Sequence, residues 1–218
     1  AGYGMSDRRD AFGCQLKARY DTTDFTTIRF EPLSITDGGT AGESDTLTVN
    51  ASNKLGFATP SRIGTYAGTD NQFNVSTILG ADAGDVMVVL PRPVTGAVGE
   101  CGVFAVTSSD AGGVRHDVGN DAPTKNWNHP PGFMPAYAET SSVVNMGSYS
   151  SRTYGITGAN ALVEKTLSET SFDTSTGSLG APSELFANIV NFQAFYGKDT
   201  NADGTIDRYD TVQPLTGD

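Results

Sequence analysis

The sequence predicts one β-rich domain of antiparallel strands joined by long loops. The chain of 218 residues carries 26 glycines and 10 prolines, together with many threonines and serines. Such a composition favours turns and β-branched strands over long helices. Short apolar runs recur along the chain, and glycine- and asparagine-rich stretches separate them. Neither an internal repeat nor a linker-like run divides the sequence, so we expect a single domain over residues 1–218.

Seven stretches carry a strand signal. In chain order they are "TTIRFEPLSIT" (26–36), "DTLTVNAS" (45–52), "GDVMVVLP" (84–91), "CGVFAVTSS" (101–109), "SRTYGIT" (151–157), "ALVEKTL" (161–167) and "NIVNFQAFYG" (188–197). The fifth and sixth are typical of a hairpin around "GAN". Alternation places Phe104 and Val106 on one face of their strand and Val103 on the other. The last stretch alternates in the same way, although the preceding "PSELFANIV" (182–190) also has helical apolar spacing.

The charge balance is acidic, with a formal net charge of -11. Nucleic acid repels a chain of this charge, so we expect no bulk nucleic-acid binding. Four basic residues near the N-terminus are interpreted as solvated surface: Arg8, Arg9, Lys17 and Arg19. No run approaches the roughly 18 apolar residues that span a bilayer. The chain begins at Ala1 without a methionine, which indicates a processed protein or a trimmed fragment.

The chain has two cysteines, Cys14 and Cys101. A low, even count in an acidic chain rich in glycine, threonine and serine suits an exported protein with one disulfide. In the chain-entropy account such a bridge would stabilise the fold by roughly 4–5 kcal/mol. Two unpaired buried thiols are the alternative. Thiol catalysis is not expected, because neither cysteine has a nearby histidine or a CxxC partner in the sequence.

A regularly spaced acidic run, "GKDTNADGTIDRYD" (197–210), matches the template of a calcium-binding loop. The ligand positions of that template fall on Asp199, Asn201, Asp203, Thr205, Asp207 and Asp210. Gly204 occupies the position of the sharp turn, and Ile206 occupies the usual apolar position. The template prefers glutamate at its last position, where this chain has the shorter Asp210.

Calcium prefers six to eight hard oxygens, and alternate side chains of a tight loop can converge on one such ion. The sequence therefore predicts a calcium site over residues 197–210. The alternative is a metal-free Asp/Asn/Gly turn between two strands. The run is not expected to form an EF-hand, since a strand precedes it and nothing helical follows. We expect calcium to fix the loop rather than to perform chemistry.

The sequence offers little evidence for catalysis. His116 and His129 both lie in a long middle excursion, and no nucleophile elbow, metalloprotease, P-loop or dinucleotide motif is present. Trp127, Phe133 and Tyr137 could form a stacking surface for a sugar, although such aromatic residues more often cover the edge of a core. We therefore expect no enzyme activity.

Five motifs in the same order resemble PilW-type minor pilins of type IV pili. They are "AGYG" followed by "FGC", "PLSITDGGTAGESDTLTV" (32–49), "AGDVMVVL" followed by "CGVFAVT", "SSRTYGIT" followed by "NALVEKTL", and "ANIVNFQAFYGKDTNADGTIDRYD" (187–210). Together they cover nearly the whole chain, and the excursion over residues 108–150 is the part they cover poorly.

The resemblance implies an α+β pilin head, in which residues 1–14 end an N-terminal helix that packs on antiparallel sheet. It implies a subunit that primes pilus assembly with other minor pilins and the major pilin, and that contributes to adhesion at the tip. The missing part of the helix would hold the subunit in the bacterial inner membrane, facing the periplasm, before assembly into the extracellular pilus. A bridge between Cys14 and Cys101 would then form in the periplasm.

Three alternatives remain open from the sequence. The chain could be a secreted, calcium-stabilised adhesin or carbohydrate-binding module, which a cleavable secretion signal and glycan binding would indicate. It could be a hydrolase with an acidic pair in a cleft, which polysaccharide turnover would reveal. A pseudopilin of type II secretion is a close relative of the pilin interpretation, and a head domain alone separates the two poorly.

Overall fold

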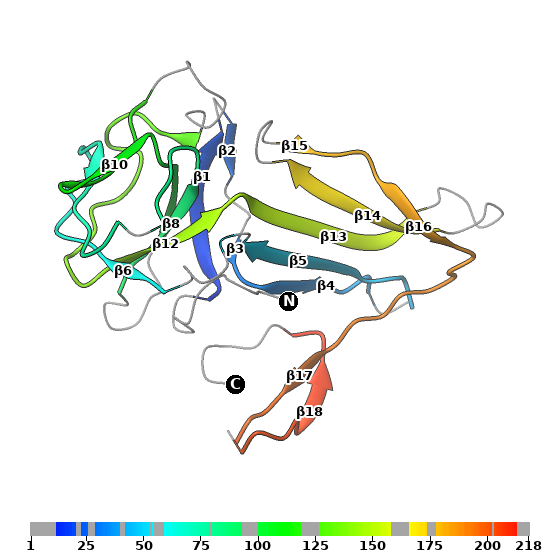
Figure 1. Cartoon of the computed structure of the whole chain (residues 1–218). Helices are drawn as coiled ribbons and strands as arrows, with labels where there is room; N and C mark the ends of the chain where they lie inside the picture. Colours follow the sequence, from blue (N-terminus) through cyan, green and yellow to red (C-terminus); the bar gives the residue numbers. More distant parts are fainter. Residues whose placement is uncertain are drawn as a thin grey trace.

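A computed structural model describes the chain over residues 12–20, 23–25, 29–39, 42–52, 54, 59–78, 80–92, 100–118, 127–157, 166–173, 178–201 and 203–212. The strands are β1 (Cys14–Tyr20), β2 (Thr23–Phe25), β3 (Arg29–Phe30), β4 (Leu33–Thr36), β5 (Thr46–Ser52), β6 (Ser61–Arg62), β7 (Gln72–Phe73), β8 (Val86–Leu90), β9 (Cys101–Ala105), β10 (Ser108–Asp110), β11 (Gly113–Arg115), β12 (Ser142–Gly147), β13 (Tyr149–Thr157), β14 (Thr166–Asp173), β15 (Ser178–Leu179), β16 (Ser183–Ala187), β17 (Tyr196–Lys198) and β18 (Arg208–Asp210). Figure 1 shows two large sheets side by side and a small C-terminal hairpin below them.

The expected α+β class is wrong, because the described residues form an almost entirely β structure without an α-helix. Of the expected helix end at 1–14, residues 1–11 lie outside the described part. Gly13 has a φ of 86° and forms a turn. Its N–H donates to the Phe30 carbonyl at 2.8 Å, and Cys14 begins β1. Sheet pairing therefore already holds the backbone there. No helix in the described part is long and apolar enough to cross a bilayer.

The larger sheet has seven strands in the order β2-β1-β9-β8-β12-β6, and β3 pairs with β1. The β1–β9 pair is parallel, whereas β8 pairs antiparallel with β9 and β12. Every residue of β8, β9 and β12 is buried. Continuous apolar runs are typical of strands covered on both faces. The predicted buried strands are confirmed over Val86–Leu90 and Cys101–Ala105, whereas residues 108–109 of the second run belong to β10 in another sheet.

Apolar side chains on the two faces of this sheet form two separate core clusters. Val86, Val88 and Leu90 of β8 point into the first cluster, while Met87 and Val89 point into the second. Strand β9 divides in the same way, since Val103 joins the first cluster and Phe104 the second, together with Val106 just beyond the strand. The predicted split of these three side chains is confirmed.

A three-stranded sheet, β10-β11-β7, contributes to the second cluster through Phe73 and Val114. Its β10–β11 hairpin lies at the start of the 108–150 excursion. The Phe73 ring stacks on Tyr66 with centroids 4.1 Å apart and on Phe104 with centroids 4.8 Å apart. This aromatic contact joins the small sheet to the large one.

The second large sheet has six strands in the order β15-β14-β13-β5-β4, and β16 also pairs with β14. Strand β13 pairs antiparallel with β14, which shares only residues 166–167 with the predicted second strand of the hairpin. The rest of that predicted strand, residues 161–165, lies outside the described part. Only Ser148 separates β12 of the first sheet from β13 of the second. One nearly continuous chain segment therefore joins the two sheets.

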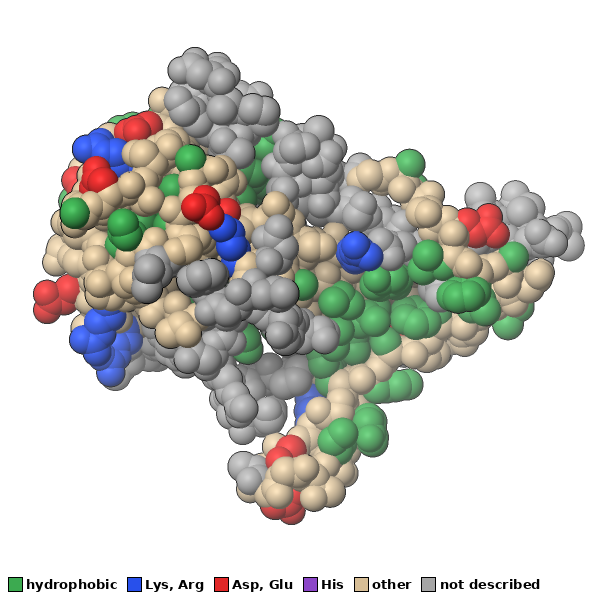
Figure 2. All heavy atoms as spheres, in the orientation of Figure 1, with side chains coloured by type: hydrophobic (Ala, Val, Ile, Leu, Met, Phe, Trp, Pro, Cys, Tyr) green, Lys and Arg blue, Asp and Glu red, His purple; other side chains and the backbone are tan. Residues whose placement is uncertain are grey.

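The two faces of the six-stranded sheet differ in polarity. On one face the register places Leu33, Val49 and Arg152 in one row, and Ile35, Leu47 and Tyr154 in the next. On the other face lie Ser34, Thr48 and Thr153, where the two threonine hydroxyls are 2.9 Å apart. Figure 2 shows apolar side chains gathered over this sheet at the surface of the molecule.

Candidate calcium loop and its surroundings

The acidic run forms the tip of the β17–β18 hairpin. Tyr196 pairs with Asp210 and Lys198 pairs with Arg208, so the loop spans residues 199–207. The Asp207 N–H donates to the Lys198 carbonyl at 2.8 Å and closes the loop at its base. Gly204 has a φ of 87°, the left-handed conformation that the template requires at this position.

The first half of the loop winds around the side-chain oxygens of three predicted ligands. Asp199 accepts the N–H of Asp203 at 3.2 Å and that of Gly204 at 2.7 Å. Asn201 Oδ1 also accepts the Asp203 N–H, at 3.0 Å. Asp203 in turn accepts the Thr205 N–H at 2.8 Å. These bonds bring Asp199, Asn201, Asp203 and Thr205 together at one side of the hairpin.

The second half of the loop places its two carboxylates elsewhere. Asp207 Oδ2 accepts both the N–H and the hydroxyl of Thr200, each at 2.8 Å. Asp210 pairs with Lys198 Nζ at 2.9 Å and with Arg208 at 2.7 Å. The structure therefore directs Asp210 toward two cations at the base of the hairpin and not toward the other predicted ligands.

The hydrogen bonds of this loop favour ionised carboxylates. The Thr205 N–H lowers the pKa of Asp203 below its ordinary value, and the Thr200 hydroxyl lowers the pKa of Asp207. Lys198 lowers the pKa of Asp210. These side chains are exposed or at the surface and carry negative charge at neutral pH.

The residues present fit a calcium ion in the first half of the loop and not at its last position. Carboxylate and amide oxygens of Asp199, Asn201 and Asp203 are the hard ligands that calcium takes. Within the described ranges, however, no three His, Cys, Asp or Glu side chains are grouped closely enough to hold a metal. A bound ion would therefore rely on Asn201, backbone carbonyls and water in addition to carboxylates.

Residues outside the predicted ligand set hold the hairpin against the six-stranded sheet. The Tyr196 hydroxyl accepts the N–H of Ile35 in the edge strand β4 at 2.7 Å. Asp45, which is buried, accepts the Ala194 N–H at 2.8 Å. Lys198 is also buried, so Asp210 supplies the counter-charge that its ammonium group needs. The sequence carries no signal for Lys198, whereas Ala194 and Tyr196 lie in the predicted alternating stretch over 188–197.

The last predicted strand, over 188–197, is confirmed only at its end. Strand β17 begins at Tyr196, and residues 188–195 are not part of a strand. Phe192 and Ala194 are nevertheless half-buried, and their neighbours Asn191, Gln193 and Phe195 are exposed. The alternation of an extended chain is therefore present, although this segment pairs with the turn before β5 instead of a strand.

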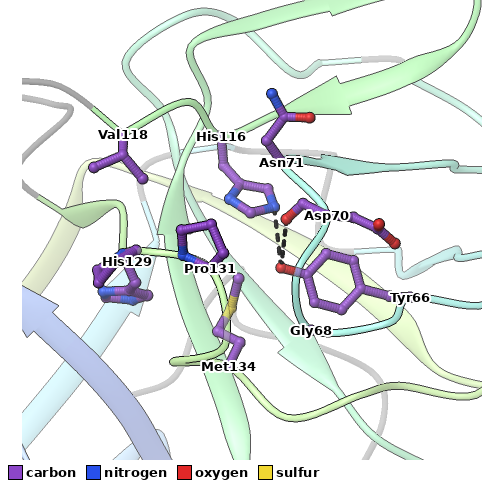
Figure 3. A pocket seen from close by; sticks show the side chains of 10 residues that line it. Tyr66, Gly68, Asp70, Asn71, His116, Val118, His129, Pro131 and Met134 are labelled. Carbon is purple, nitrogen blue, oxygen red and sulfur yellow. Dashed lines mark hydrogen bonds between the residues drawn. The ribbon is translucent and has the colours of Figure 1, made fainter.

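One pocket in the described part lies beside the second core cluster. It is lined by Tyr66, Gly68, Asp70, Asn71, His116, Val118, His129, Pro130, Pro131 and Met134. Figure 3 shows the Tyr66 hydroxyl between the Asp70 carbonyl, to which it donates at 2.9 Å, and His116 Nε2 at 3.4 Å. His116 packs on Phe73 and Phe104, and His129 Nε2 lies 2.8 Å from the Val103 carbonyl oxygen.

Burial lowers the pKa of His116 to about 4, although the Asp117 and Asp70 carboxylates act in the opposite direction. In the unfolded chain the His116 imidazole binds a proton near pH 6.5, whereas in the folded chain it binds one only near pH 4. We expect this difference to remove about 3 kcal/mol of stability between pH 7 and pH 4. Urea unfolding of the wild type and His116→Phe at both pH values measures it. Parallel losses in the two proteins would contradict the prediction.

The aromatic residues proposed as a sugar platform belong largely to the core. Trp127 and Tyr137 are 4% and 3% exposed, and Phe133 is half-buried. The Arg19 guanidinium lies 4.5 Å from the centroid of the Phe133 ring, and Lys17 pairs with Glu100 at 3.2 Å. The interpretation of these aromatic residues as cover for the core edge is confirmed. Of the basic N-terminal residues, Arg8 and Arg9 lie outside the described part.

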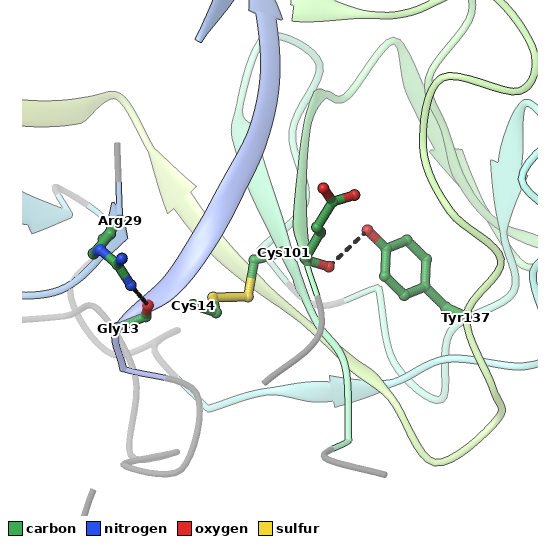
Figure 4. The surroundings of a disulfide bond; sticks show 6 residues. Gly13, Cys14, Arg29, Cys101 and Tyr137 are labelled. Carbon is green, nitrogen blue, oxygen red and sulfur yellow. Dashed lines mark hydrogen bonds between the residues drawn. A yellow bond between two sulfur atoms is a disulfide. The ribbon is translucent and has the colours of Figure 1, made fainter. Parts of the chain in front are cut away.

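The predicted bridge between Cys14 and Cys101 is present. Cys14 begins β1 and Cys101 begins its parallel neighbour β9, and the two Cα atoms are 6.0 Å apart. Figure 4 shows the disulfide between these strands, with the Arg29 guanidinium donating to the Gly13 carbonyl nearby. Both sulfurs are buried in the first core cluster, and the bridge closes a sequence separation of 87 residues.

Residues 153–218 match the model of a protein family described as type IV pilus-assembly protein W, PilW. The match covers the chain from β13 onward and includes the acidic loop. It confirms the resemblance to the PilW type there, while the resemblance of residues 1–152 stays a prediction. The match supports a protein related to type IV pilus assembly, associated with the cell envelope or the pilus and acting with other pilus components. No curated protein and no solved structure matches the chain.

Proposed function

Because residues 153–218 match a family of type IV pilus-assembly proteins, we propose that the chain is the head of a minor pilin. In this role it primes pilus assembly together with other minor pilins, and its task is structural rather than catalytic. The family match is the single observation that carries this proposal. The acidic, disulfide-linked, strand-rich head is compatible with it.

The disulfide supports a place outside the cytoplasm. Bridges of this kind form and persist in oxidising compartments such as the bacterial periplasm. We propose that the subunit is held in the inner membrane by a helix preceding this head, with the head in the periplasm, and that it later joins the extracellular pilus.

Binding to the other minor pilins tests the proposal. The 218-residue chain, immobilised through its C-terminus, is expected to retain at least one purified minor-pilin head encoded in the same operon. The codons upstream of Ala1 are expected to encode a leader ending in glycine, followed by about 20 apolar residues that can span a bilayer. A cleavable secretion signal and no retained pilin would overturn the proposal in favour of a secreted adhesin.

We also propose that the loop over residues 199–210 binds calcium, with Asp199, Asn201 and Asp203 as side-chain ligands. When bound, the ion would neutralise carboxylates that otherwise repel one another. The N–H groups of Asp203, Gly204 and Thr205 already hold the carboxylates of Asp199 and Asp203 in the first half of the loop. The base of the hairpin is anchored to β4 through the Tyr196 hydroxyl. A bound ion would fix the tip of the same hairpin.

Calcium removal should lower the melting temperature of the protein. A ligand present at a hundred times its Kd stabilises the folded state by about 2.7 kcal/mol, and a chelator cancels this gain. We expect Asp203→Ala to abolish the difference between calcium and chelator, and Glu139→Ala, an exposed carboxylate elsewhere, to preserve it. Identical melting curves of the wild type in calcium and in chelator would refute the site.

Adhesion at the pilus tip is a second candidate, favoured by exposed apolar side chains near the C-terminus. Adhesion through a glycan would need aromatic residues other than Trp127 and Tyr137 to stack on the sugar, since both are buried. Glycan-array binding by the chain separates this role from assembly alone.

A further inference from the structure

Exposed apolar side chains are concentrated in one part of the chain. Of the large apolar residues that the described part exposes, all but Val118 lie between residues 185 and 212. They are Leu185, Phe186, Val190, Phe195, Ile206, Tyr209 and Val212. Together we refer to these seven residues as the C-terminal apolar surface. Scattered single residues of this kind need no explanation, whereas a concentration along one segment indicates an interaction site.

The C-terminal apolar surface continues onto the six-stranded sheet. Phe186 lies in β16 opposite Leu167 of β14, and all five residues of β16 are exposed. The apolar rows of β4, β5 and β13 are only half-buried. In Figure 2 the apolar side chains over this sheet and those along the segment leading to the hairpin lie at the same side of the molecule.

Strand β16 also forms an outer edge of its sheet. It pairs with β14 on one side, and β15 occupies the same side of β14 further along. Proteins commonly protect such edges with charges, proline or bulges. The register of β16 shifts between the partners Leu167 and Ser168 of β14, so that Leu185 is the extra, unpaired residue of a bulge. The side chains of Leu185 and Phe186 are nevertheless 40% and 64% exposed. The bulge thus limits strand addition, while the apolar side chains remain available for packing.

Charged side chains lie beside the C-terminal apolar surface. Glu184 adjoins Leu185 in β16, Asp207 follows Ile206 at the tip of the hairpin, and Asp203 lies in the same loop, while Arg208 lies next to Tyr209. All of these side chains are exposed, and the whole chain has a formal net charge of -11. A symmetric contact between two copies would bring the same carboxylates face to face, which like-charge repulsion opposes. The charge pattern fits a partner with an apolar centre and a rim of lysines and arginines.

We propose that the C-terminal apolar surface is the docking site for a different pilus subunit, one that presents an apolar patch with a basic rim. The proposal rests on the assembly role proposed above and adds where the partner binds and what its surface carries. Apolar burial would supply the affinity, and the acidic rim would accelerate association with a basic partner.

The test compares substitutions inside and outside this surface. The variant Leu185→Ser/Phe186→Ser/Phe195→Ser removes three exposed side chains, and Val118→Ser removes an apolar side chain of similar exposure elsewhere. Affinities of the 218-residue chain for each purified minor-pilin head are measured by surface plasmon resonance. We expect the triple variant to lose at least tenfold in affinity for one partner and Val118→Ser to bind like the wild type. Raising the salt concentration should slow association.

The outcomes show whether the docking site, the assembly role or both fail. Wild-type binding that the triple variant retains would overturn the docking site and leave the assembly role intact. Absence of wild-type binding to every pilin would overturn both. Self-association of the wild type that the triple variant abolishes would show that a second copy occupies the surface instead. A clear fall in the melting temperature of the triple variant would show that the chain's own segments cover it, which also overturns the proposal.

Discussion

Replacing Cys14 and Cys101 together by alanine is expected to lower the free energy of unfolding by about 4–5 kcal/mol. The bridge closes a sequence separation of 87 residues, and a loop of that length restricts the unfolded chain strongly in the chain-entropy account. For a chain of this size the loss corresponds to roughly 10–15 °C in Tm. Differential scanning calorimetry of the two proteins measures it. Alanine is preferred to serine, because both positions are buried and a hydroxyl would lack a partner.

Reduction provides the matched control. Wild-type protein in reducing agent should melt close to the double alanine variant, and that variant should not respond to the reducing agent. Labelling of the unfolded wild type with a thiol reagent should detect no free cysteine unless a reductant is added. Two reactive thiols in the untreated protein would contradict the disulfide and restore the alternative of unpaired cysteines.

Gly113→Ala is expected to destabilise the fold by about 3 kcal/mol. Gly113 has a φ of 138°, and a Cβ atom at this position would lie 2.1 Å from the Phe73 carbonyl oxygen of the neighbouring strand. Strands β11 and β7 would have to separate, which would disturb the stacking of Phe73 on Tyr66 and Phe104. Urea unfolding compares the variant with the wild type.

Gly132→Ala isolates the backbone part of that effect. Gly132 also has a positive φ, 88°, but a Cβ atom there would meet nothing within 4 Å. This substitution should therefore cost only about 1 kcal/mol of backbone strain. Equal losses in the free energy of unfolding of the two variants would show that the close approach of β11 to β7 does not add to the cost of a side chain at position 113.

Strands with a strong local signal could be predicted from the sequence. The runs that became β8 and β9 are apolar at every position or nearly so, and such short runs form buried strands in many contexts. The strand over 151–157 was predictable from its alternating run, whereas its partner β14 begins at Thr166, near the end of the run predicted for it. The tight turn at Gly204 was predictable because only glycine occupies that conformation without strain.

Elements decided by distant contacts could not be predicted. The stretch over 182–190 has helical spacing, yet residues Ser183–Ala187 form β16 because β14 offers them a pairing edge. Residues 188–195 alternate like a strand but hydrogen-bond to the turn before β5. The helix expected at residues 1–14 came from a family resemblance, and at Gly13 the contact with Phe30 already imposes sheet pairing.

The candidate site was predictable in the first half of the loop and not in the second. Asp199, Asn201 and Asp203 are placed by their own hydrogen bonds to nearby backbone, which follow from local spacing. The position of Asp210 is instead set by its ion pair with Lys198, which lies six positions before Gly204. The burial of Lys198 depends on packing against the rest of the fold. Local spacing carries no information about such a partner.

The pairing of β13 with β5 affects how the family-matching segment can be exchanged between proteins. Residues 153–218 begin within β13, whose neighbour β5 and the next strand β4 come from residues 33–52. A chimera that imports only this segment from another pilus protein would place foreign β13 residues opposite native Thr48 and Leu47, the partners of Thr153 and Tyr154. Successful grafts should therefore carry residues 33–52 as well, so that paired strands come from the same protein.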